Sequence, residues 1–338
     1  MTALTKSPPS VNMARRKKPF WRNATNYLYL VPAFLIMGVI TYYPMLYQVW
    51  MSFTDYGLKN LRVGAPWPAF VGLSNYISIL TNQLGLSYFN FWHILAFDLW
   101  WTFSNVIIHV SLGILIAVVL NRQGLWFKSF YRALFIIPMV LPQIIVATIF
   151  KNMFDPDYGA INQGLAVLGK TFLGLSPTLF HINWIEQVQF PISWLPLPLA
   201  YFALLITNIW LGWPFMTIVA SGALQSIPKD LYEAATIDGA NSSQQFWRVT
   251  LPLIRPAMVP AAVYGIVATF NLFTLIFFMT NGGPLEETEI LVTAAYNLIT
   301  QQHIYGIAAA FCVYIFIILL ALTLITNALT RATESYDV

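Results

Sequence analysis

A chain of 338 residues that is 58% apolar, 16% aromatic and only 9% charged does not have the composition of a soluble globule. Soluble domains carry about 25% charged residues. The composition therefore predicts a membrane protein, with lipid as the solvent of its apolar surface. The net charge of +4 would suit a nucleic acid, but the basic residues follow membrane sidedness, so we expect no nucleic-acid partner. A single cysteine, Cys312, excludes an internal disulfide and a cysteine-rich metal site.

The N-terminal residues 1–26 are polar and include the basic run Arg15-Arg16-Lys17-Lys18, which we interpret as part of a flexible cytosolic tail. The apolar run that follows, 27–50, is longer than the core of a secretory signal peptide. It also continues through Tyr42-Tyr43-Pro44, where a signal peptide would have a small-residue cleavage site. We predict that this run is retained as the first membrane span.

Five more apolar runs lie near 99–121, 133–150, 199–224, 257–280 and 304–328. Each has roughly the 20 residues needed to cross about 30 Å of hydrocarbon as a helix. Within these bounds none of the six runs contains Asp, Glu, Lys or Arg. Lipid offers no partners to backbone groups, so we predict an all-α membrane protein with six transmembrane helices in one domain, 27–330, and a short tail, 331–338. Kinks are expected at Pro32, Pro138, Pro142 and Pro214.

The distribution of Lys and Arg predicts the orientation. With the N-terminus inside, thirteen of these residues fall on the inner side and four on the outer side. Because inner loops carry the excess of positive charge, both termini and the loop 226–256 are predicted to be cytoplasmic.

The loop 226–256 is the only long stretch between two apolar runs that combines charge, helix signals and helix breakers. Pro228 suits a first helical position, because its missing N–H would be unpaired there. Gly239 suits the left-handed residue that ends a helix. A second helix is predicted to start at Ser242, with Gln245 completing a capping box. Pro252 and Pro256 are then expected to break the chain before the next span.

This loop resembles the cytoplasmic coupling loop of ABC importer permeases, whose pattern is E-A-A, three residues, G, nine residues, then I-x-L-P. The matching residues here are Glu233, Ala234, Ala235, Gly239, Leu251 and Pro252, with Asp238 beside the glycine and Val249 in place of isoleucine. The resemblance implies that the short helix docks in a groove of a separate ATPase subunit. ATP and magnesium would be bound by that subunit, so no cofactor is expected in this chain.

Three other stretches resemble the carbohydrate-uptake group of this family, which includes maltose, trehalose, raffinose and glycerol-phosphate permeases. They are 70–76 (FVGLSNY), 280–284 (TNGGP) and 305–310 (YGIAAA). The resemblance covers about 25–330 and implies a type I ABC importer permease fold in a bacterial or archaeal inner membrane. The implied partners are a second permease subunit in a heterodimer, two ATPase subunits, and a periplasmic or lipid-anchored sugar-binding protein. The outer segments 54–98 and 151–198 are expected to form the cap on which that protein lands.

A sugar path needs amide, hydroxyl and aromatic groups near the middle of the membrane. The fourth span offers Asn208, Leu211, Gly212 and Phe215, and the fifth offers Gly265, Thr269, Asn271 and Phe273. In the maltose permease the stretch that matches Leu211, Gly212 and Phe215 contributes to the sugar site, as the resemblance implies. The fifth span has fewer asparagines than the maltose type, which argues against maltose itself. Plain helix packing is the alternative for each of these residues.

Two further motifs are assigned no catalytic role. Residues 164–171 (GLAVLGKT) match the phosphate-loop pattern, but no strand precedes them and they are predicted to lie outside, away from ATP. His109 lies within the second span, and we expect a neutral imidazole that bonds to a neighbouring helix rather than a proton relay.

The sequence therefore predicts a non-enzymatic transport subunit that works by alternating access and is driven by a partner ATPase. Its expected substrate is a carbohydrate: a di- or oligosaccharide, trehalose- or glucoside-like, or a related polyol. The alternative is a secondary transporter driven by an ion gradient. Such a transporter would need charged residues or broken-helix ion sites within its spans, and the six runs contain no acid or base. No catalytic set of Ser, His and Asp is expected on one membrane face.

Overall fold

The computed structural model describes residues 28–86, 89–122, 124–191 and 194–330. The predicted tails 1–26 and 331–338 therefore lie outside the described residues. The chain divides into two compact units, residues 1–50 and 51–338, and each is described by itself.

The first unit is a single interrupted helix. Helix α2 (Val31–Met37), the π-helical turn η1 (Gly38–Tyr42) and α3 (Tyr43–Met51) follow one another without a gap. Together they give 21 residues apolar enough to cross a membrane, which confirms the first predicted span. The expected kink at Pro32 is wrong, because Pro32 lies in the first turn of α2, where its missing N–H disturbs no helical hydrogen bond.

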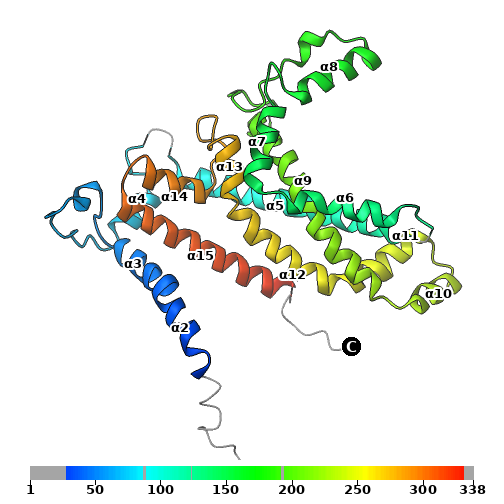
Figure 1. Ribbon diagram of the computed structural model, residues 1–338, viewed down its shortest axis with the longest axis horizontal. Helices are drawn as coiled ribbons and strands as arrows, with labels where there is room; N and C mark the ends of the chain where they lie inside the picture. The colour runs from blue at the N-terminus through cyan, green and yellow to red at the C-terminus, as the bar shows by residue number, and fades with distance from the viewer. Residues whose placement is uncertain (1–27, 87–88, 123, 192–193, 331–338) are drawn as a thin grey trace, which may run out of the picture. The chain divides into compact units, whose positions relative to one another are not determined.

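Three long helices form the centre of the second unit. They are α5 (Phe91–Leu120), α9 (Leu199–Gln225) and α12 (Leu251–Phe270), and Figure 1 shows them running side by side. Small residues allow the close approach: a Cβ added to Gly113 of α5 would stand 2.4 Å from Cβ of Met216 on α9. Without a hydrophobic force between helices in lipid, such close backbone contact is what holds spans together.

The third predicted span is broken. Helices α6 (Lys128–Val140) and α7 (Gln143–Met153) meet at an angle of 94° at Leu141-Pro142. Pro142 provides the break, whereas Pro138 stays inside α6. Among the described residues five helices are long enough to span, and counting this bent pair as one gives the six that were predicted.

The fifth span begins earlier than predicted and is interrupted near its end. Helix α11 (Ser242–Gln245), the π-helical turn η4 (Phe246–Thr250), α12 and α13 (Phe273–Met279) form one run from Ser242 to Met279. The predicted chain break at Pro252 and Pro256 is therefore wrong. Pro252 occupies the first turn of α12 and Pro256 lies inside it. The actual interruption is at Asn271-Leu272, between α12 and α13.

The sixth span, α15 (Tyr305–Thr330), packs against the short helices α4 (Ser74–Leu80) and α14 (Leu291–Thr300). The two signature stretches FVGLSNY and YGIAAA meet here at the segment 52–56. The Asn75 amide donates to the carbonyl oxygens of Ser52 and Thr54, each at 2.9 Å, and the Gly306 N–H donates to Tyr56 O at 2.8 Å. A Cβ on Gly306 would stand 2.2 Å from Thr54 O, so only glycine fits.

The remaining elements lie outside the spans. They are the 3-10 turns η2 (Leu58–Leu61) and η3 (Pro177–Phe180), and α8 (Ala160–Leu173). The phosphate-loop pattern falls inside α8, so its backbone N–H groups belong to a helix, as expected from the missing strand. Gly169 of that pattern serves packing, since its Cβ would stand 2.3 Å from Cζ of Phe180.

The prediction that no span contains a charged residue is wrong. Helix α5 begins at Phe91 rather than near 99, because the Asn90 side chain accepts from the N–H groups of Trp92 and His93 and caps it. Asp98 is therefore a fully buried residue of a spanning helix. The described helices of the spans also contain Lys128, Arg132, Lys151 and Arg255, which lie near their ends.

Candidate functional site

The loop 226–256 folds as predicted around one helix and a left-handed glycine. Helix α10 (Lys229–Ile237) starts after Pro228, which is its N-cap rather than its first residue. Gly239 has φ of +80°, and the N–H of Ala240 donates to Ala235 O at 2.9 Å. A side chain would have open space at Gly239, so the glycine is required by its backbone conformation and not by crowding.

The next helix, α11, starts at Ser242 as predicted, but its capping residues lie one position earlier than predicted. Asn241, not Ser242, is the N-cap of α11: its side chain accepts from the Gln244 N–H at 2.9 Å, and the Gln244 side chain accepts from the Asn241 N–H at 2.9 Å. Gln244 therefore completes the capping box in place of Gln245. Gln245 instead donates to Thr236 Oγ1 at 3.0 Å, which ties α11 back to α10.

Helix α10 turns apolar side chains outward. Ile237 is 87% exposed and Leu231 is 42% exposed, and Glu233, Ala234 and Asp238 are exposed beside them. Ala235 is half-buried. A second contact joins α10 to the fifth span: the Tyr232 and Thr250 hydroxyls lie 3.0 Å apart. Leu251, the next residue, packs into the core between α5, α9 and α12, while Pro252 is exposed.

A cavity of about 1230 Å³ separates this loop from the ends of α5 and α9. Its lining includes Lys229, Tyr232 and Glu233 of α10 on one side. On the other side it includes Arg122, which follows α5, and Lys128, which begins α6. The cavity therefore separates α10 from the ends of α5 and α9.

Four of the eight predicted path residues are occupied by packing within the subunit. Asn208 is buried, and its side-chain amide donates to Asn105 Oδ1 on α5 at 2.8 Å. Gly212 lies under the His109 ring, and Gly265 faces Met216 of α9. Thr269 is buried as well. For Asn208, Gly212 and Gly265 the structure favours the packing alternative, because these positions contact neighbouring helices; for Thr269 only its burial does so.

The other four predicted path residues retain exposed surface. Leu211 and Phe215 are half-buried on α9, and the Phe215 ring lies 5.4 Å from the Tyr264 ring of α12. Asn271 is exposed at the interruption of the fifth span, where Phe273 begins α13. These side chains lie on the same two helices, α9 and the α12–α13 run, and supply an amide and two aromatic faces.

His109 behaves as expected. Its Nε2 lies 2.9 Å from the backbone oxygen of Asn208 on α9, so the imidazole bonds a neighbouring helix. The ring also fills the space above Gly212, where an added Cβ would stand 2.2 Å from Cε1. Asn105, one turn before His109 on α5, accepts a hydrogen bond from the Asn208 side chain, so both residues of α5 bond Asn208 of α9.

Two buried carboxyl groups were missed by the sequence prediction. Asp98 Oδ2 accepts from the N–H of Leu291 at 3.1 Å, at the start of α14. Its Oδ1, Trp101 Nε1 and Thr102 Oγ1, all within one turn of α5, have no hydrogen-bond partner in the described part of the chain. The signal that could have revealed Asp98 is its spacing of seven residues before Asn105 on one helix face.

The second missed carboxyl is Glu289, in the loop between the fifth and sixth spans. It is 3% exposed and its Oε1 accepts from the Asn297 amide at 2.7 Å. Burial, together with the charge of Glu286, raises the pKa of Glu289 to about 7. Burial also raises the pKa of Glu286. In the described ranges no group of three or more His, Cys, Asp and Glu side chains is arranged to hold a metal ion.

Comparison with known proteins identifies the family. Residues 109–335 match the family described as binding-protein-dependent transport system inner membrane component. The galactooligosaccharides transport system permease protein of Bacillus subtilis is 32% identical over 88% of this chain and 68% of its own length. The trehalose/maltose transport system permease protein of Thermococcus litoralis is 31% identical over 88% of this chain and 91% of its own length.

A solved structure shares the fold. It is a bacterial ABC transporter involved in the import of the acidic polysaccharide alginate, with a TM-score of 0.73 over 92% of this chain and 96% of that chain, at 22% identity. The chain has the fold of type I ABC importer permeases and is a transport component rather than an enzyme. It belongs to the family of binding-protein-dependent transport system inner membrane components, the permease subunits of ABC transporters.

Proposed function

We propose that this chain is the membrane-spanning subunit of an ATP-driven importer of a di- or oligosaccharide. The observation that carries the proposal is the outward apolar face of α10, with Ile237 87% and Leu231 42% exposed outside the spans. An exposed apolar helix face with charged neighbours is typical of a helix that inserts into a groove of a partner. Glu233 and Asp238 flank that face.

The partner of α10 in this proposal is an ATPase subunit, one of two that bind ATP and magnesium. A second permease subunit completes the membrane part, and a periplasmic or lipid-anchored sugar-binding protein delivers the substrate. This chain holds no cofactor and performs no chemistry. The relatives named above are permease proteins of oligosaccharide systems, which supports a carbohydrate substrate.

The contacts of α10 supply a route for mechanical coupling. Its Tyr232 bonds Thr250, the residue directly before α12 in the long helical run from Ser242 to Met279. A displacement of α10 by closing ATPase subunits would therefore act on a helix that reaches Asn271, near the proposed path. In alternating access this motion opens the outer side while ATP is bound, and hydrolysis resets the inward state.

The sugar path is proposed to run over Leu211, Phe215, Asn271 and Phe273. Asn271 offers an amide for sugar hydroxyls, and the Phe215 and Phe273 rings offer faces for stacking. Phe273 belongs to a ring cluster, at 4.9 Å from Phe277 and 5.0 Å from Tyr296. Such pairing holds the ring in one orientation, as a stacking surface requires.

The coupling proposal is tested by purifying the tagged chain with its operon partners and measuring how much ATPase subunit is retained. Glu233→Lys and Gly239→Asp should each lose the ATPase subunit while the chain still inserts. Lys170→Glu on α8 is the matched control, since it changes a charge on an exposed helix outside this loop. Full retention by both loop variants would refute the docking role of α10.

The path is tested by uptake of a panel of oligosaccharides into vesicles. Phe215→Ala and Asn271→Ala should raise the sugar concentration for half-maximal uptake by roughly tenfold, the loss expected for a stacking face or a buried hydrogen bond. Phe172→Ala is the control, because Phe172 is 77% exposed on α8. Unchanged uptake in both path variants would remove these residues from the path.

The ion-gradient alternative no longer fails on the absence of charge, because Asp98 is buried in a span. The bond from Leu291 N–H gives Asp98 a structural role at α14, which does not require an ion. Uptake that continues in the presence of a protonophore and stops on ATP depletion would support the ATP-driven proposal. The opposite result would favour the alternative.

A further inference from the structure

A groove of about 250 Å³ lies between α6 and the last part of α9, at the end of α9 that continues into the coupling loop. Its walls are apolar and come from Leu120, Phe135, Ile136, Pro214 and Ile218. Its lining within α9 runs from Pro214 to Gln225, which is the second half of that helix. The groove therefore extends from just past the middle of the span to the end that continues into the coupling loop.

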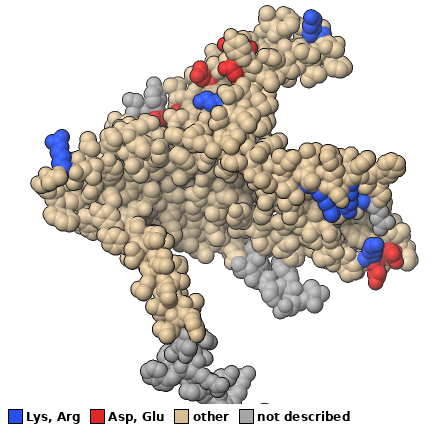
Figure 2. Space-filling model, in the orientation of Figure 1, with Lys and Arg blue, Asp and Glu red and all other residues tan. Residues whose placement is uncertain are grey.

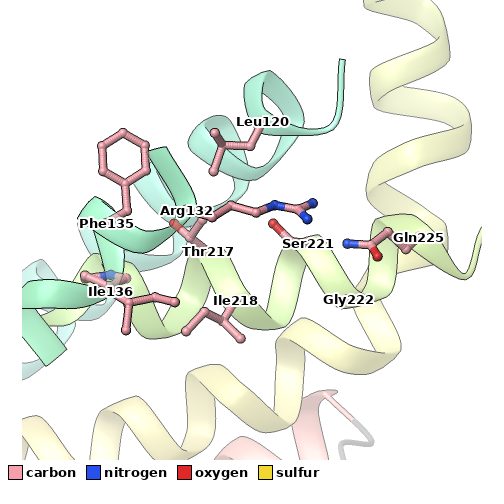
Figure 3. A pocket seen from close by; sticks show the side chains of 10 residues that line it. Leu120, Arg132, Phe135, Ile136, Thr217, Ile218, Ser221, Gly222 and Gln225 are labelled. Atoms are coloured by element: carbon pink, nitrogen blue, oxygen red, sulfur yellow. The ribbon is translucent and has the colours of Figure 1, made fainter. Parts of the chain in front are cut away.

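One end of the groove is polar and basic. Figure 3 shows the Arg132 guanidinium extending over the groove toward Ser221 and Gln225 of α9. Within the described ranges Arg132 makes no hydrogen bond or ion pair with any residue of this chain. A guanidinium has five N–H donors, and those of Arg132 form no hydrogen bond within the described ranges.

The surroundings add positive charge. Arg122 and Lys128 lie at the adjoining ends of α5 and α6, and both line the larger cavity beside this groove. Figure 2 shows Lys and Arg side chains gathered over α6, and acidic side chains close to them at α10, where Glu233 lines the same larger cavity. Among the residues that line the groove itself Arg132 alone is charged, so the groove suits an anionic ligand.

We propose that the groove binds an anionic phospholipid. The phosphate is held by Arg132, with Ser221 and Gln225 donating to its oxygens, and one acyl chain lies along the apolar walls. Basic pockets between spanning helices on the cytoplasmic side suit anionic headgroups, and the cytoplasmic leaflet supplies them. The assignment of this end to the cytoplasm rests on the proposed function, in which the coupling loop meets an ATPase.

A glycine keeps the groove open. Gly222 lines it, and an ideal Cβ at this position meets no atom within 4 Å. A larger side chain here would enter the groove without striking the backbone of a neighbour. Leucine is also a better helix former than glycine, so Gly222→Leu closes the groove without weakening α9.

The test measures lipid that stays with the purified chain. The chain is extracted from nanodiscs containing equal phosphatidylglycerol and phosphatidylcholine, and retained lipid is identified by native mass spectrometry. Wild type should retain phosphatidylglycerol in preference. Arg132→Gln should lower that retention about tenfold, because a charge-assisted contact is lost. Gly222→Leu should lower retention of both lipids.

The matched control is Arg255→Gln, which removes an exposed arginine from α12 outside the groove and should leave retention unchanged. All variants are compared at equal elution behaviour and equal thermal stability, so that misfolding is excluded. Equal phosphatidylglycerol retention by wild type and Arg132→Gln would overturn the proposal. So would equal retention of the two lipids by wild type.

A competing occupant is the second permease subunit. Efficient cross-linking of the variant Ile218→Cys to that subunit would show that protein covers the groove, and this too would overturn the lipid site. The proposed function fails separately, if the wild-type chain retains no ATPase subunit in the pull-down described above. Lipid retained without an ATPase partner would leave the site standing and remove the importer.

Discussion

The His109 ring lies directly over Gly212, so that the two residues fix the distance between α5 and α9. An added Cβ at Gly212 would stand 2.2 Å from Cε1 of the ring, and His109 Nε2 lies 2.9 Å from Asn208 O. The histidine therefore acts as a spacer that also bonds a backbone oxygen one turn away from the glycine. This contact explains both residues through packing.

We expect Gly212→Ala to destabilise the subunit by about 1–3 kcal/mol, because overpacking forces the ring or the helices apart. The measurement is thermal unfolding in detergent. Gly222→Ala is the control on the same helix, where a Cβ meets nothing, and it should be neutral or slightly stabilising. Partial recovery in the double variant Gly212→Ala with His109→Ala would confirm the contact; equal stability of both glycine variants would contradict it.

A second prediction concerns the turn after α10. Gly239 has φ of +80°, so a β-branched residue should cost about 1–2 kcal/mol at this position and displace α10. Gly239→Val should therefore reduce ATP-dependent uptake strongly, whereas Gly239→Asn should retain most of it, because asparagine tolerates this conformation. Uptake is measured in vesicles at equal protein level. Equal loss in both variants would point to a contact with the partner and not to backbone conformation.

Asp98 is predicted to stabilise the start of α14. Its Oδ2 accepts from Leu291 N–H at 3.1 Å, so Asp98→Ala should cost about 1 kcal/mol or more, as for loss of a helix cap. Asp98→Asn keeps an acceptor and should cost less. Hydrogen exchange of the amides of 291–294 reports the local effect. Unchanged exchange in Asp98→Ala would show that the bond contributes nothing to α14.

The burial of Glu289 leads us to expect that the free energy of unfolding depends on pH. Burial and the Glu286 charge raise the pKa of Glu289 to about 7 in the folded chain, above its ordinary value of 4.5. Between these values the folded state binds more protons than the unfolded state, so stability falls as pH rises through this window and levels off above about 7. The total decrease from this group is up to about 3 kcal/mol.

The check is the unfolding temperature of wild type and Glu289→Gln from pH 5 to pH 8. The glutamine side chain retains an acceptor for Asn297, so the variant should gain stability at pH 8 and lose most of the slope. Glu186→Gln, an exposed position, is the control and should keep the wild-type slope. A slope that persists in Glu289→Gln would assign the pH dependence to another group.

The sequence alone determined the class of protein, the number of spans and the plan of the coupling loop. These depend on local properties: apolar length sets a span, and a glycine just after a short helix, here Gly239 after α10, sets a turn with positive φ. Gly239 and α10 were predicted for this reason. The capping position was missed by one residue, because Asn241 and Ser242 are both good caps and only the hydrogen bonds distinguish them.

Only the tertiary structure decided which of the predicted path residues are engaged in packing within the subunit. Asn208 and Gly212 carry the same sequence signal as Phe215, yet their side-chain positions are filled by Asn105 and His109 from α5, about 100 residues earlier in the chain. Asp98 lies one residue outside the predicted run 99–121 but inside helix α5, where a bond from Leu291, 193 residues away, satisfies one of its oxygens. Such contacts join distant segments, and no local pattern specifies them.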